Sequence, residues 1–478
     1  MSPTPSIRRA IIFACLLPLA APSGAVPIVP DDPAVIISDR VVALTHARVV
    51  DGLGNPAREG QTLLLRDGVI AAIGAKIEIP ADAVVHDLTG KTVIPGLVMA
   101  HEHNFYRSLA GGPFHMNYME YSFPRMYLAA GVTTARTTGS LEPYTDLELK
   151  RRIAMGKSIG PDYHLTAPYV DGPETGIAQL HGVEDSADAA RMISYWAAEG
   201  FTSVKLYVNL PSDEMRTAIE TAHAHGMQVT GHIGKVSYRE ATALGIDNIE
   251  HGFLAASDWL PGRIPDETAN IGAIYDSIAQ LDPQSDEAAA VIQHLVDEGV
   301  AVTSTLAIFE TFTGGRPPVG EAELAVLAAP LRESYLKSWV AINQADREVR
   351  KNAWSNNLIM EVEFFRRGGL LVVGTDPTGY GGCLAGYGSW RAIELLVEAG
   401  LTPLEAIQCA TSYGARLLGV ADKKGRIKEG YQADLIIVDG APDQDIADFR
   451  KTETVFKSGI GYDSATLFQS AAGKVGIQ

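Results

Sequence analysis

The sequence predicts an α/β protein in which a (β/α)8 TIM barrel carries a small composite β-sandwich formed by both termini. Three observations support this fold class. The chain has 478 residues, enough for a full barrel and a second, smaller module. Strand-like runs separated by turn residues occupy both ends of the chain. Between them, eight strand-like runs alternate with helical or long connecting stretches, which is the strand count of a closed parallel barrel.

The two ends of the chain share one strand-rich texture. Residues 40–93 contain short apolar runs separated by turn signals such as Asp51-Gly52, and the same pattern returns in residues 425–459. Because two such ends flank a mixed middle, we expect them to build one sandwich together. The expected domains are a sandwich of residues 26–95 and 421–478 around a metal-dependent barrel at 96–420.

Residues 1–25 form a separate segment with the layout of a secretory signal peptide. Arg8 and Arg9 precede an apolar stretch at 10–21, and Ser23-Gly24-Ala25 supplies small residues for cleavage. The apolar stretch is too short to span a membrane. We therefore expect an exported protein, periplasmic or secreted, and a lipid anchor on this segment stays open as an alternative.

Charge and cysteine content narrow the range of partners. The formal net charge of −18 argues against nucleic acid or an anionic membrane, since both require basic patches. We expect a small-molecule substrate, no membrane span and a homo-oligomer, because closed homo-oligomers are common. Past the leader, Cys383 lies in a Gly-rich loop and Cys409 on a predicted helix, so free thiols are at least as well supported as a disulfide.

The barrel strands are predicted where apolar or β-branched runs precede helical patterning. After the last of them come two helical stretches, at 391–399 and 403–418. The eight predicted strands are 92–99, 132–137, 163–167, 202–207, 228–232, 248–251, 300–305 and 370–375.

The motif His101-Glu102-His103 directly follows the first predicted strand. Residues two apart in a strand point to the same side, so both imidazoles can face one metal ion. A second pair, His223-Ala224-His225, precedes Gly226 at a predicted helix end, where a histidine readily interacts with the helix dipole. We expect the first pair to bind metal and the second to stay away from it.

Four more candidate ligands end later strands. Lys205 closes the fourth strand, His232 the fifth and His251 the sixth, and Asp376 follows the eighth. Each has a structural alternative when taken alone: a solvated lysine, a core histidine, or a turn residue before Pro377. A lysine aimed into a barrel mouth must have its charge used or removed. Reaction of its neutral amine with carbon dioxide gives an anionic carbamate that can bridge two cations.

With these motifs the chain resembles the amidohydrolase superfamily, in its two-metal branch with a carboxylated lysine. The resemblance includes the Pro95-Gly96-Leu97 lead-in and the closing strand at 430–435, and it points to imidazolonepropionase-like and prolidase-like members. It implies an N6-carboxylated Lys205 at a two-metal site. One divalent ion would be held by His101, His103, Lys205 and Asp376, and the other by Lys205, His232 and His251.

The predicted reaction is hydrolysis of a carbon–nitrogen bond in an amide or peptide-like small molecule, such as a dipeptide or an N-acyl amino acid. Two divalent ions, for which zinc suits these ligands best, would share a hydroxide, lower its pKa and polarise the carbonyl. Asp376 would pass the hydroxide's proton to the leaving nitrogen. The hydroxyl of Tyr238 is expected to form a hydrogen bond with the substrate carbonyl or carboxylate. The alternative is that Tyr238 only packs inside the protein. Arg136 would suit a substrate carboxylate, with a buried ion pair as its alternative.

Other reactions remain to be weighed against this one. Superfamily deaminases of the one-metal kind generally lack the strand-four lysine and place a glutamate soon after the strand-five histidine. Here Lys205 is present and Glu240 is eight residues past His232, which disfavours deamination. Hydrolysis of a lactone or an organophosphate uses the same metal pair and stays open. A non-catalytic barrel would be expected to have lost some ligands, yet all six remain. The sequence leaves the substrate and the native metal open.

Overall fold

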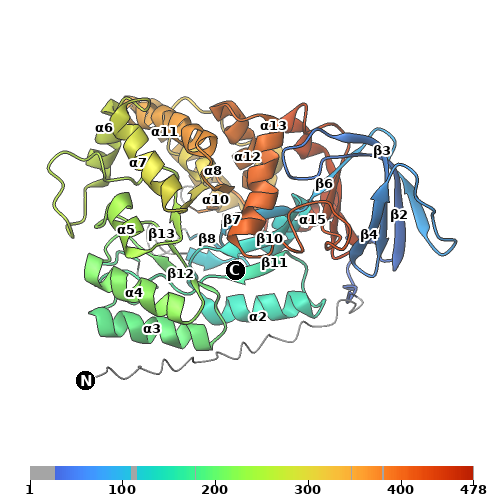
Figure 1. The fold of residues 1–478 in the computed structure, drawn as a ribbon, viewed down its shortest axis with the longest axis horizontal. Coiled ribbons are helices and arrows are strands. Elements are labelled where there is room, and N and C mark those ends of the chain that lie inside the picture. The colour runs from blue at the N-terminus through green and yellow to red at the C-terminus, as the bar shows by residue number, and fades with distance from the viewer. Residues whose placement is uncertain (1–26, 109–115, 178, 346, 379–381, 477–478) are drawn as a thin grey trace, which may run out of the picture.

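The computed structural model describes residues 27–108, 116–177, 179–345, 347–378 and 382–476, and the expected signal peptide at 1–25 lies outside them. Figure 1 shows helices surrounding one set of strands, with a second sheet at one side of the molecule. Two sequence textures explain this division. Runs that alternate apolar and polar residues form the second sheet, and short apolar runs followed by amphipathic helices form the first set.

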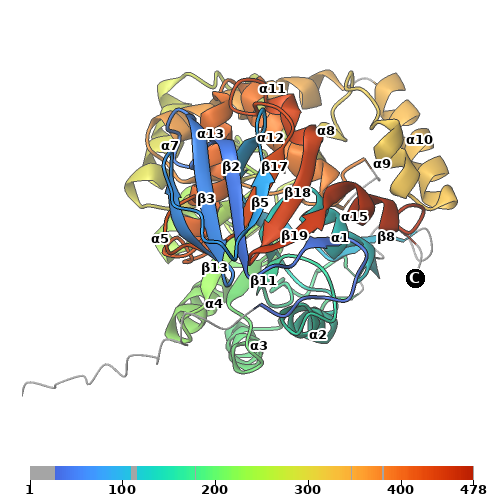
Figure 2. The ribbon, with the colours of Figure 1, turned by 90° about the vertical axis from the view of Figure 1, so that its right-hand side faces the viewer.

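Nine strands from both ends of the chain form one sheet, and Figure 2 shows the N-terminal and C-terminal strands side by side. The order is β1-β19-β18-β17-β6-β2-β3-β4, and β5 pairs with β2 off this path. The strands are β1 (Val35–Ile37), β2 (Val41–Val49), β3 (Arg58–Arg66), β4 (Val69–Gly74), β5 (Val84–Asp87), β6 (Thr92–Pro95), β17 (Leu435–Val438), β18 (Thr452–Lys457) and β19 (Ile460–Asp463).

The expected sandwich is therefore one continuous sheet in its hydrogen bonding. The physical reason is the length of β2, which pairs with β3 along its whole length on one edge and with β5 and then β6 along the other. The two ends of the chain meet where β17 runs antiparallel to β6, with Ile436 opposite Ile94. A cluster of buried aliphatic residues from both ends, including Leu63 and Leu435, forms a core of its own at this sheet.

Eight parallel strands follow one another in chain order in two further sheets. One sheet has the order β11-β10-β7 and the other β12-β13-β14-β15-β16. The strands are β7 (Leu97–Glu102), β10 (Val132–Thr137), β11 (Asp162–Leu165), β12 (Ser203–Leu206), β13 (Gln228–Gly231), β14 (Asn248–Glu250), β15 (Ala301–Ser304) and β16 (Leu371–Val373).

Backbone hydrogen bonds also join the edges of these two sheets. Between β11 and β12, the amide of Ala167 donates to the carbonyl of Ser203 over 2.9 Å. Between β16 and β7, the amides of Thr375 and Asp376 each donate to the carbonyl of His101 over 3.0 Å. Gly374 permits the second contact, because a Cβ there would lie 2.2 Å from the Cβ of His101.

The first predicted strand, 92–99, is wrong as a single element, since it divides into β6 and β7 at Gly96. Its first half belongs to the nine-stranded sheet and its second half to the parallel strands. Gly96 makes the crossing possible, because a Cβ at this position would lie 2.2 Å from the Thr133 hydroxyl oxygen. The other seven predicted strands coincide with β10 to β16 to within two residues at each end.

Several of the helices begin at side chains that cap them. Ser237 starts α5 and Thr402 starts α13 with a capping box, and Gly245 ends α5 in the left-handed region. The helices are α1 (Ser122–Ala129), α2 (Pro143–Ala154), α3 (Ser186–Ala198), α4 (Ser212–Ala224), α5 (Tyr238–Leu244), α6 (Ile271–Gln280), α7 (Asp286–Asp297), α8 (Leu306–Glu310), α9 (Glu321–Val326), α10 (Ala329–Gln344), α11 (Glu348–Arg366), α12 (Tyr387–Ala399), α13 (Pro403–Gln408), α14 (Gly414–Leu417) and α15 (Ser464–Ser470).

The predicted helix at 403–418 is interrupted by a π-helical turn, Cys409–Tyr413, between α13 and α14. Hydroxyls within this turn bond elsewhere: Ser412 donates to the carbonyl of Gly52 over 2.7 Å, and Thr411 donates to the carbonyl of Ile407 over 2.6 Å. Such competing bonds are typical of irregular helical turns. Smaller elements are the hairpin of β8 (Phe105–Arg107) and β9 (Met116–Tyr118) and a 3-10 segment, Ile446–Lys451.

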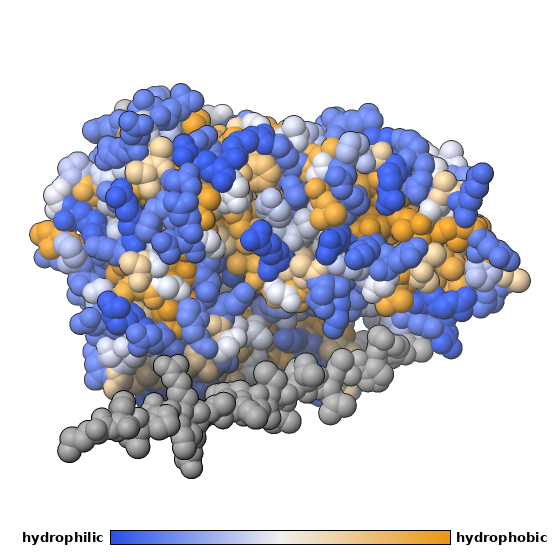
Figure 3. Space-filling view, viewed as in Figure 1, coloured by the Kyte–Doolittle hydropathy of each residue, from blue (hydrophilic) through white to orange (hydrophobic). Residues whose placement is uncertain are grey.

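The described residues present a mostly hydrophilic face (Figure 3), and Cys383 and Cys409 are free thiols. Figure 3 shows a mostly hydrophilic face, with hydrophobic residues gathered toward the side of the nine-stranded sheet. Among the described residues, none of the helices combines the length and apolar character that a bilayer span requires. Cys383 and Cys409 are both buried and free, which confirms the free-thiol alternative.

Candidate metal centre

The six predicted ligands line a single cavity of about 270 Å³. His101 is the penultimate residue of β7, and His103 follows the end of that strand. Lys205 lies in β12. The other three come after parallel strands: His232 directly after β13, His251 directly after β14 and Asp376 three residues after the end of β16. The carboxyl ends of the strands therefore deliver all six side chains to one place, as expected for parallel strands.

The ligand atoms of this group converge on Asp376. Its Oδ1 lies 3.3 Å from Nε2 of His103 and 3.8 Å from Nε2 of His101, and its Oδ2 lies 4.0 Å from Nδ1 of His251. Atoms of His101, His251 and Asp376 all lie within 4.8 Å of one another. Because metal–nitrogen and metal–oxygen bonds are close to 2 Å, such spacing leaves room for a divalent ion among them.

The remaining predicted ligands adjoin this group. The ring of His232 lies 4.3 Å from the ring of His251, measured between centroids. Lys205 is almost completely buried and lines the same cavity. Burial lowers the pKa of Lys205 to about 8, against the opposing effect of Glu250 and Asp376. A neutral amine, the form that reacts with carbon dioxide, is therefore accessible near neutral pH.

The protonation states of these groups suit metal ligation. Burial lowers the pKa of His232 to about 4 and holds the pKa values of His101 and His251 well below their usual range, so all three imidazoles are neutral. Burial acts to raise the pKa of Asp376, but His101 and His103 outweigh it and keep the carboxyl ionised. Nitrogen lone pairs and one carboxylate thus face the cavity together.

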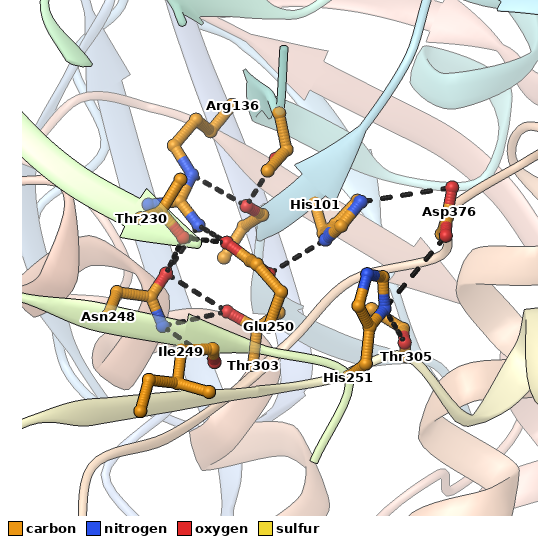
Figure 4. Close-up of polar contacts among 12 residues, drawn as sticks. His101, Arg136, Thr230, Asn248, Ile249, Glu250, His251, Thr303, Thr305 and Asp376 are labelled. Atoms are coloured by element: carbon orange, nitrogen blue, oxygen red, sulfur yellow. Dashed lines mark hydrogen bonds and ion pairs between the residues drawn. The ribbon is translucent and has the colours of Figure 1, made fainter. Parts of the chain in front are cut away.

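Glu250, which the sequence analysis did not single out, orients His101. Figure 4 shows its carboxylate reaching His101, with Oε2 at 2.7 Å from Nδ1. Burial acts to raise the pKa of Glu250, but Lys205 and Arg136 outweigh it, so the carboxylate is ionised and accepts the hydrogen. The hydrogen of His101 is then on Nδ1, and the lone pair on Nε2 faces the cavity.

Arg136 forms the buried ion pair that was the alternative to a substrate clamp. Its Nη2 donates to Glu250 over 2.7 Å and to Asn248 over 2.6 Å, and its Nε donates to the carbonyl of Ala100 over 2.7 Å. Thr230 also donates to Glu250. The strand pattern carried a signal for this network, because Asn248 and Glu250 alternate with Ile249 along β14 and so face one side.

Two of the predicted ligands occupy strained backbone positions. His251 has φ of +74° and Asp376 has φ of +50°, in the left-handed region that non-glycine residues rarely adopt. Nδ1 of His251 lies 2.9 Å from the hydroxyl of Thr305. The amide of Phe253 donates to Asn357 over 2.8 Å and holds the turn that follows His251. Such outliers persist where surrounding contacts fix them, as they do here.

Tyr238 lies away from the cavity, which corrects the expectation that its hydroxyl contacts substrate. The side chain is fully buried in α5, and the hydroxyl donates to the carbonyl of Gly252 over 2.9 Å. Its packing alternative therefore describes the structure: Tyr238 supports the turn after His251. The sequence could not distinguish the two roles, because spacing after His232 does not reveal the direction of the side chain.

The second histidine pair lies at the end of α4, as expected. His223 contacts Asp247 over 3.0 Å on the surface, and His225 is the C-terminal cap residue of the helix. Neither side chain belongs to the lining of the metal-ligand cavity.

Comparison with known proteins agrees with this arrangement. Residues 92–461 match the amidohydrolase family. An enamidase of Eubacterium barkeri is 25% identical over 213 residues, which cover 42% of this chain and 52% of the enamidase. The chain thus spans about half the length of that relative. An imidazolonepropionase of Deinococcus deserti is 25% identical over 321 residues, or 56% of this chain and 74% of the relative. The crystal structure of a Xaa-Pro dipeptidase with bound methionine aligns with a TM-score of 0.65, 19% identity and coverage of 88% of this chain and 100% of the other.

Proposed function

The chain belongs to the amidohydrolase family, whose members here are hydrolases of carbon–nitrogen bonds, and from that premise we propose that it cleaves an amide or peptide-like bond in a small molecule such as a dipeptide or an N-acyl amino acid. One observation carries the proposal: six potential ligands from five parallel strands line one cavity. Neutral imidazoles beside an ionised carboxylate form a donor set for divalent cations, which this family generally uses.

The residues present fit a pair of divalent ions, for which we propose zinc. Nδ1 of His103 is buried without a hydrogen-bond partner among the described residues, while its Nε2 faces Asp376. His101, His103, Lys205 and Asp376 would hold one ion and Lys205, His232 and His251 the other, with Lys205 carboxylated on its amine. When bound, the ions supply an activated water and polarise the scissile carbonyl.

The residues of the chain itself hold and move the proton. Glu250 fixes His101 through Nδ1, so the imidazole does not need to reorient during turnover. Asp376 is ionised and lies among the ligands, where its carboxylate takes a proton from the attacking water and delivers it to the leaving nitrogen. Thr378 donates to Oδ1 of Asp376 over 3.0 Å and orients this carboxylate.

The proposal extends to the architecture and the location of the protein. We infer that the eight parallel strands close into a barrel, which the backbone hydrogen bonds at both sheet edges support. A composite sandwich from residues 26–95 and 421–478 would stand beside it, and the leader at 1–25 would direct export to the periplasm or beyond. A homo-oligomer is also part of this proposal.

A screen of metal-loaded protein against dipeptides and N-acyl amino acids, with release of free amino acid as the signal, tests the proposed reaction. We expect hydrolysis by the parent and a loss of about a hundredfold or more in kcat for Asp376→Asn, because the proton carrier is removed. The variant should keep the parent's circular dichroism spectrum. A rate for Asp376→Asn close to that of the parent would remove this carboxylate from the proton transfer.

A further inference from the structure

The cavity around the metal ligands is walled by apolar and aromatic side chains and holds one additional cation, Arg107. Resting on the proposed function, we propose that the protein selects N-acyl amino acids or dipeptides with bulky apolar groups beside the scissile amide and a carboxylate that pairs with Arg107. Two apolar walls, the charges between them and the volume of the cavity favour such a substrate.

The first wall begins immediately after the histidine motif. Phe105 stacks on His103, with 4.4 Å between ring centroids and an angle of 28° between the planes. Phe105, Leu141 and Tyr169 form a small buried cluster of their own, separate from the main core. Tyr207 meets Tyr169 edge to face at 5.0 Å. This wall therefore offers a continuous apolar surface beside the imidazoles, where aromatic or aliphatic groups pack favourably.

The second wall is α8 and the residues that follow it. Ile308, Phe309 and Phe312 line the cavity from this side. The ring of Phe309 lies 5.5 Å from that of His251 and 6.3 Å from that of Phe312. Since β15 leads directly into α8, the wall is attached to one of the parallel strands. A substrate bound at the ligands thus has apolar groups on both sides.

The charges of the cavity oppose a basic substrate side chain. Among the described lining residues, Asp376 supplies the one carboxylate, and it belongs to the metal ligands. A lysine or arginine side chain of the substrate would lose water here without gaining a counter-charge, which is unfavourable. Arg107 lies in β8 opposite Met116 of β9, and both line the cavity. A guanidinium in this position suits a substrate carboxylate.

The volume sets the size of the substrate. About 270 Å³ is just below the usual range for small-molecule sites, and it suits one amino acid with a compact acyl group or a dipeptide. Bulky apolar substrate groups fill such a space and remove the apolar surface of the walls from water, which favours binding. Small groups leave that surface in contact with water.

Steady-state kinetics with N-acetyl and glycyl derivatives of phenylalanine, leucine, alanine, glutamate and arginine test the inference. We expect kcat/KM for the phenylalanine or leucine derivative to exceed kcat/KM for the alanine derivative by about 10- to 100-fold. It should exceed kcat/KM for the arginine derivative by at least the same factor. N-acetyl-phenylalaninamide, which lacks the carboxylate, should have a KM at least about tenfold above that of the acid.

Two variants locate the effect in the cavity. Phe309→Ala should reduce the preference for phenylalanine over alanine several-fold, while Phe365→Ala, the same change in a partly buried side chain of α11, should leave it unchanged. Arg107→Gln should abolish the difference in KM between the acid and the amide. Each ratio compares two substrates with the same variant, so a smaller fraction of folded protein lowers both values equally. The ratio therefore measures specificity rather than folding.

The outcomes separate this inference from the proposed function. Hydrolysis with equal rates for all side chains, or with a preference for arginine, would overturn the apolar specificity and leave the amide hydrolysis standing. An unchanged acid-to-amide ratio in Arg107→Gln would overturn the carboxylate pairing. No hydrolysis of any compound by folded, metal-loaded protein would overturn the proposed function, and this inference with it.

Discussion

At the scale of single residues, Lys205 is the side chain whose removal should do most damage. Its buried amine lies among the predicted metal ligands, and its carbamate is proposed to join the two ions. We expect Lys205→Ala to lower kcat/KM by about a thousandfold and to reduce metal content, because one ligand is lost from each ion. Steady-state kinetics and elemental analysis of the same preparation measure both effects.

A matched control and a rescue make this test specific. Lys150→Ala changes a partly buried lysine of α2, outside the cavity lining, and should leave metal content unchanged. A short carboxylic acid added to Lys205→Ala should restore part of the activity by replacing the bridging carboxylate. Parent-like turnover of the variant without any added acid would contradict the bridging role.

Tyr238 provides a second test at this scale. Its hydroxyl donates to the carbonyl of Gly252 inside the protein, so Tyr238→Phe leaves a buried carbonyl without this partner. We expect the free energy of unfolding in urea to fall by about 1 kcal/mol, with KM little changed. A KM that rises tenfold at unchanged stability would restore the role of substrate contact that the sequence had predicted.

The sequence predicted the positions of the candidate ligands but not the residues that hydrogen-bond to them and orient them. Each ligand follows a recognisable strand, so its position could be predicted from local pattern alone. Glu250 and Thr305 contact histidines that are 149 and 54 residues away in the chain, and Asn357 meets the turn after His251 from α11. Such contacts depend on tertiary packing, which local periodicity does not encode.

At the scale of elements, the end of β14 depends on a glycine. Gly252 has φ of +59°, and a Cβ there would lie 2.1 Å from Oε1 of Glu361 and 2.7 Å from Oδ1 of Asn357. Both groups belong to α11. Gly252→Ala therefore adds a clash to the backbone strain and should displace His251, the preceding residue.

Gly226→Ala is the matched control, because Gly226 has φ of +71° but open space where the Cβ would be. We expect the control to lose about 1 kcal/mol of unfolding free energy from backbone strain alone. Gly252→Ala should lose about 1–3 kcal/mol more and bind metal less tightly. Equal losses in the two variants, at equal metal affinity, would show that α11 does not restrain this turn.

The boundaries of elements were harder to predict than their existence. The run at 92–99 is apolar throughout, so pattern alone could not show that Gly96 carries the chain from one sheet to another. The helix at 403–418 has an apolar period, yet a π turn interrupts it where the hydroxyl of Ser412 donates to the carbonyl of Gly52, which is far away in the chain. In both places tertiary contacts overrule the local preference.

At the scale of the whole molecule, a charge cluster ties the nine-stranded sheet to the parallel strands. Nζ of Lys424 donates to Asp434 over 2.9 Å and to Asp162 over 2.6 Å. Asp162 belongs to β11 and Asp434 directly precedes β17. Lys457 of β18 adds a second cation, with Nζ at 2.8 Å from Asp162. The cluster thus joins the C-terminal part of the nine-stranded sheet to β11 of the parallel strands.

Lys424→Met tests the contribution of this cluster to stability. Because Asp434 is buried, we expect a loss of about 3–5 kcal/mol in unfolding free energy at neutral pH, where its carboxylate would be left unpaired. Burial acts to raise the pKa of Asp162, but Lys424 and Lys457 outweigh it and hold that pKa below its ordinary value. The stabilisation is therefore present above about pH 4 and lost as the pH falls further.

Denaturant unfolding of parent and variant across pH 3 to 8 measures this dependence. The gap between the two proteins should be full from pH 5 upward and shrink toward pH 3, as the carboxylates gain protons. A gap that stays constant over the whole range would show that charge pairing does not hold the two sheets together.

The proposed function depends on two divalent cations held at the carboxyl ends of five parallel strands. Elemental analysis of the purified parent, after saturation with zinc and removal of free ion, measures their number. We expect about two zinc ions per chain in the parent and at most about one in Lys205→Ala. A parent that binds one ion or none, at full folding by circular dichroism, would contradict this proposal.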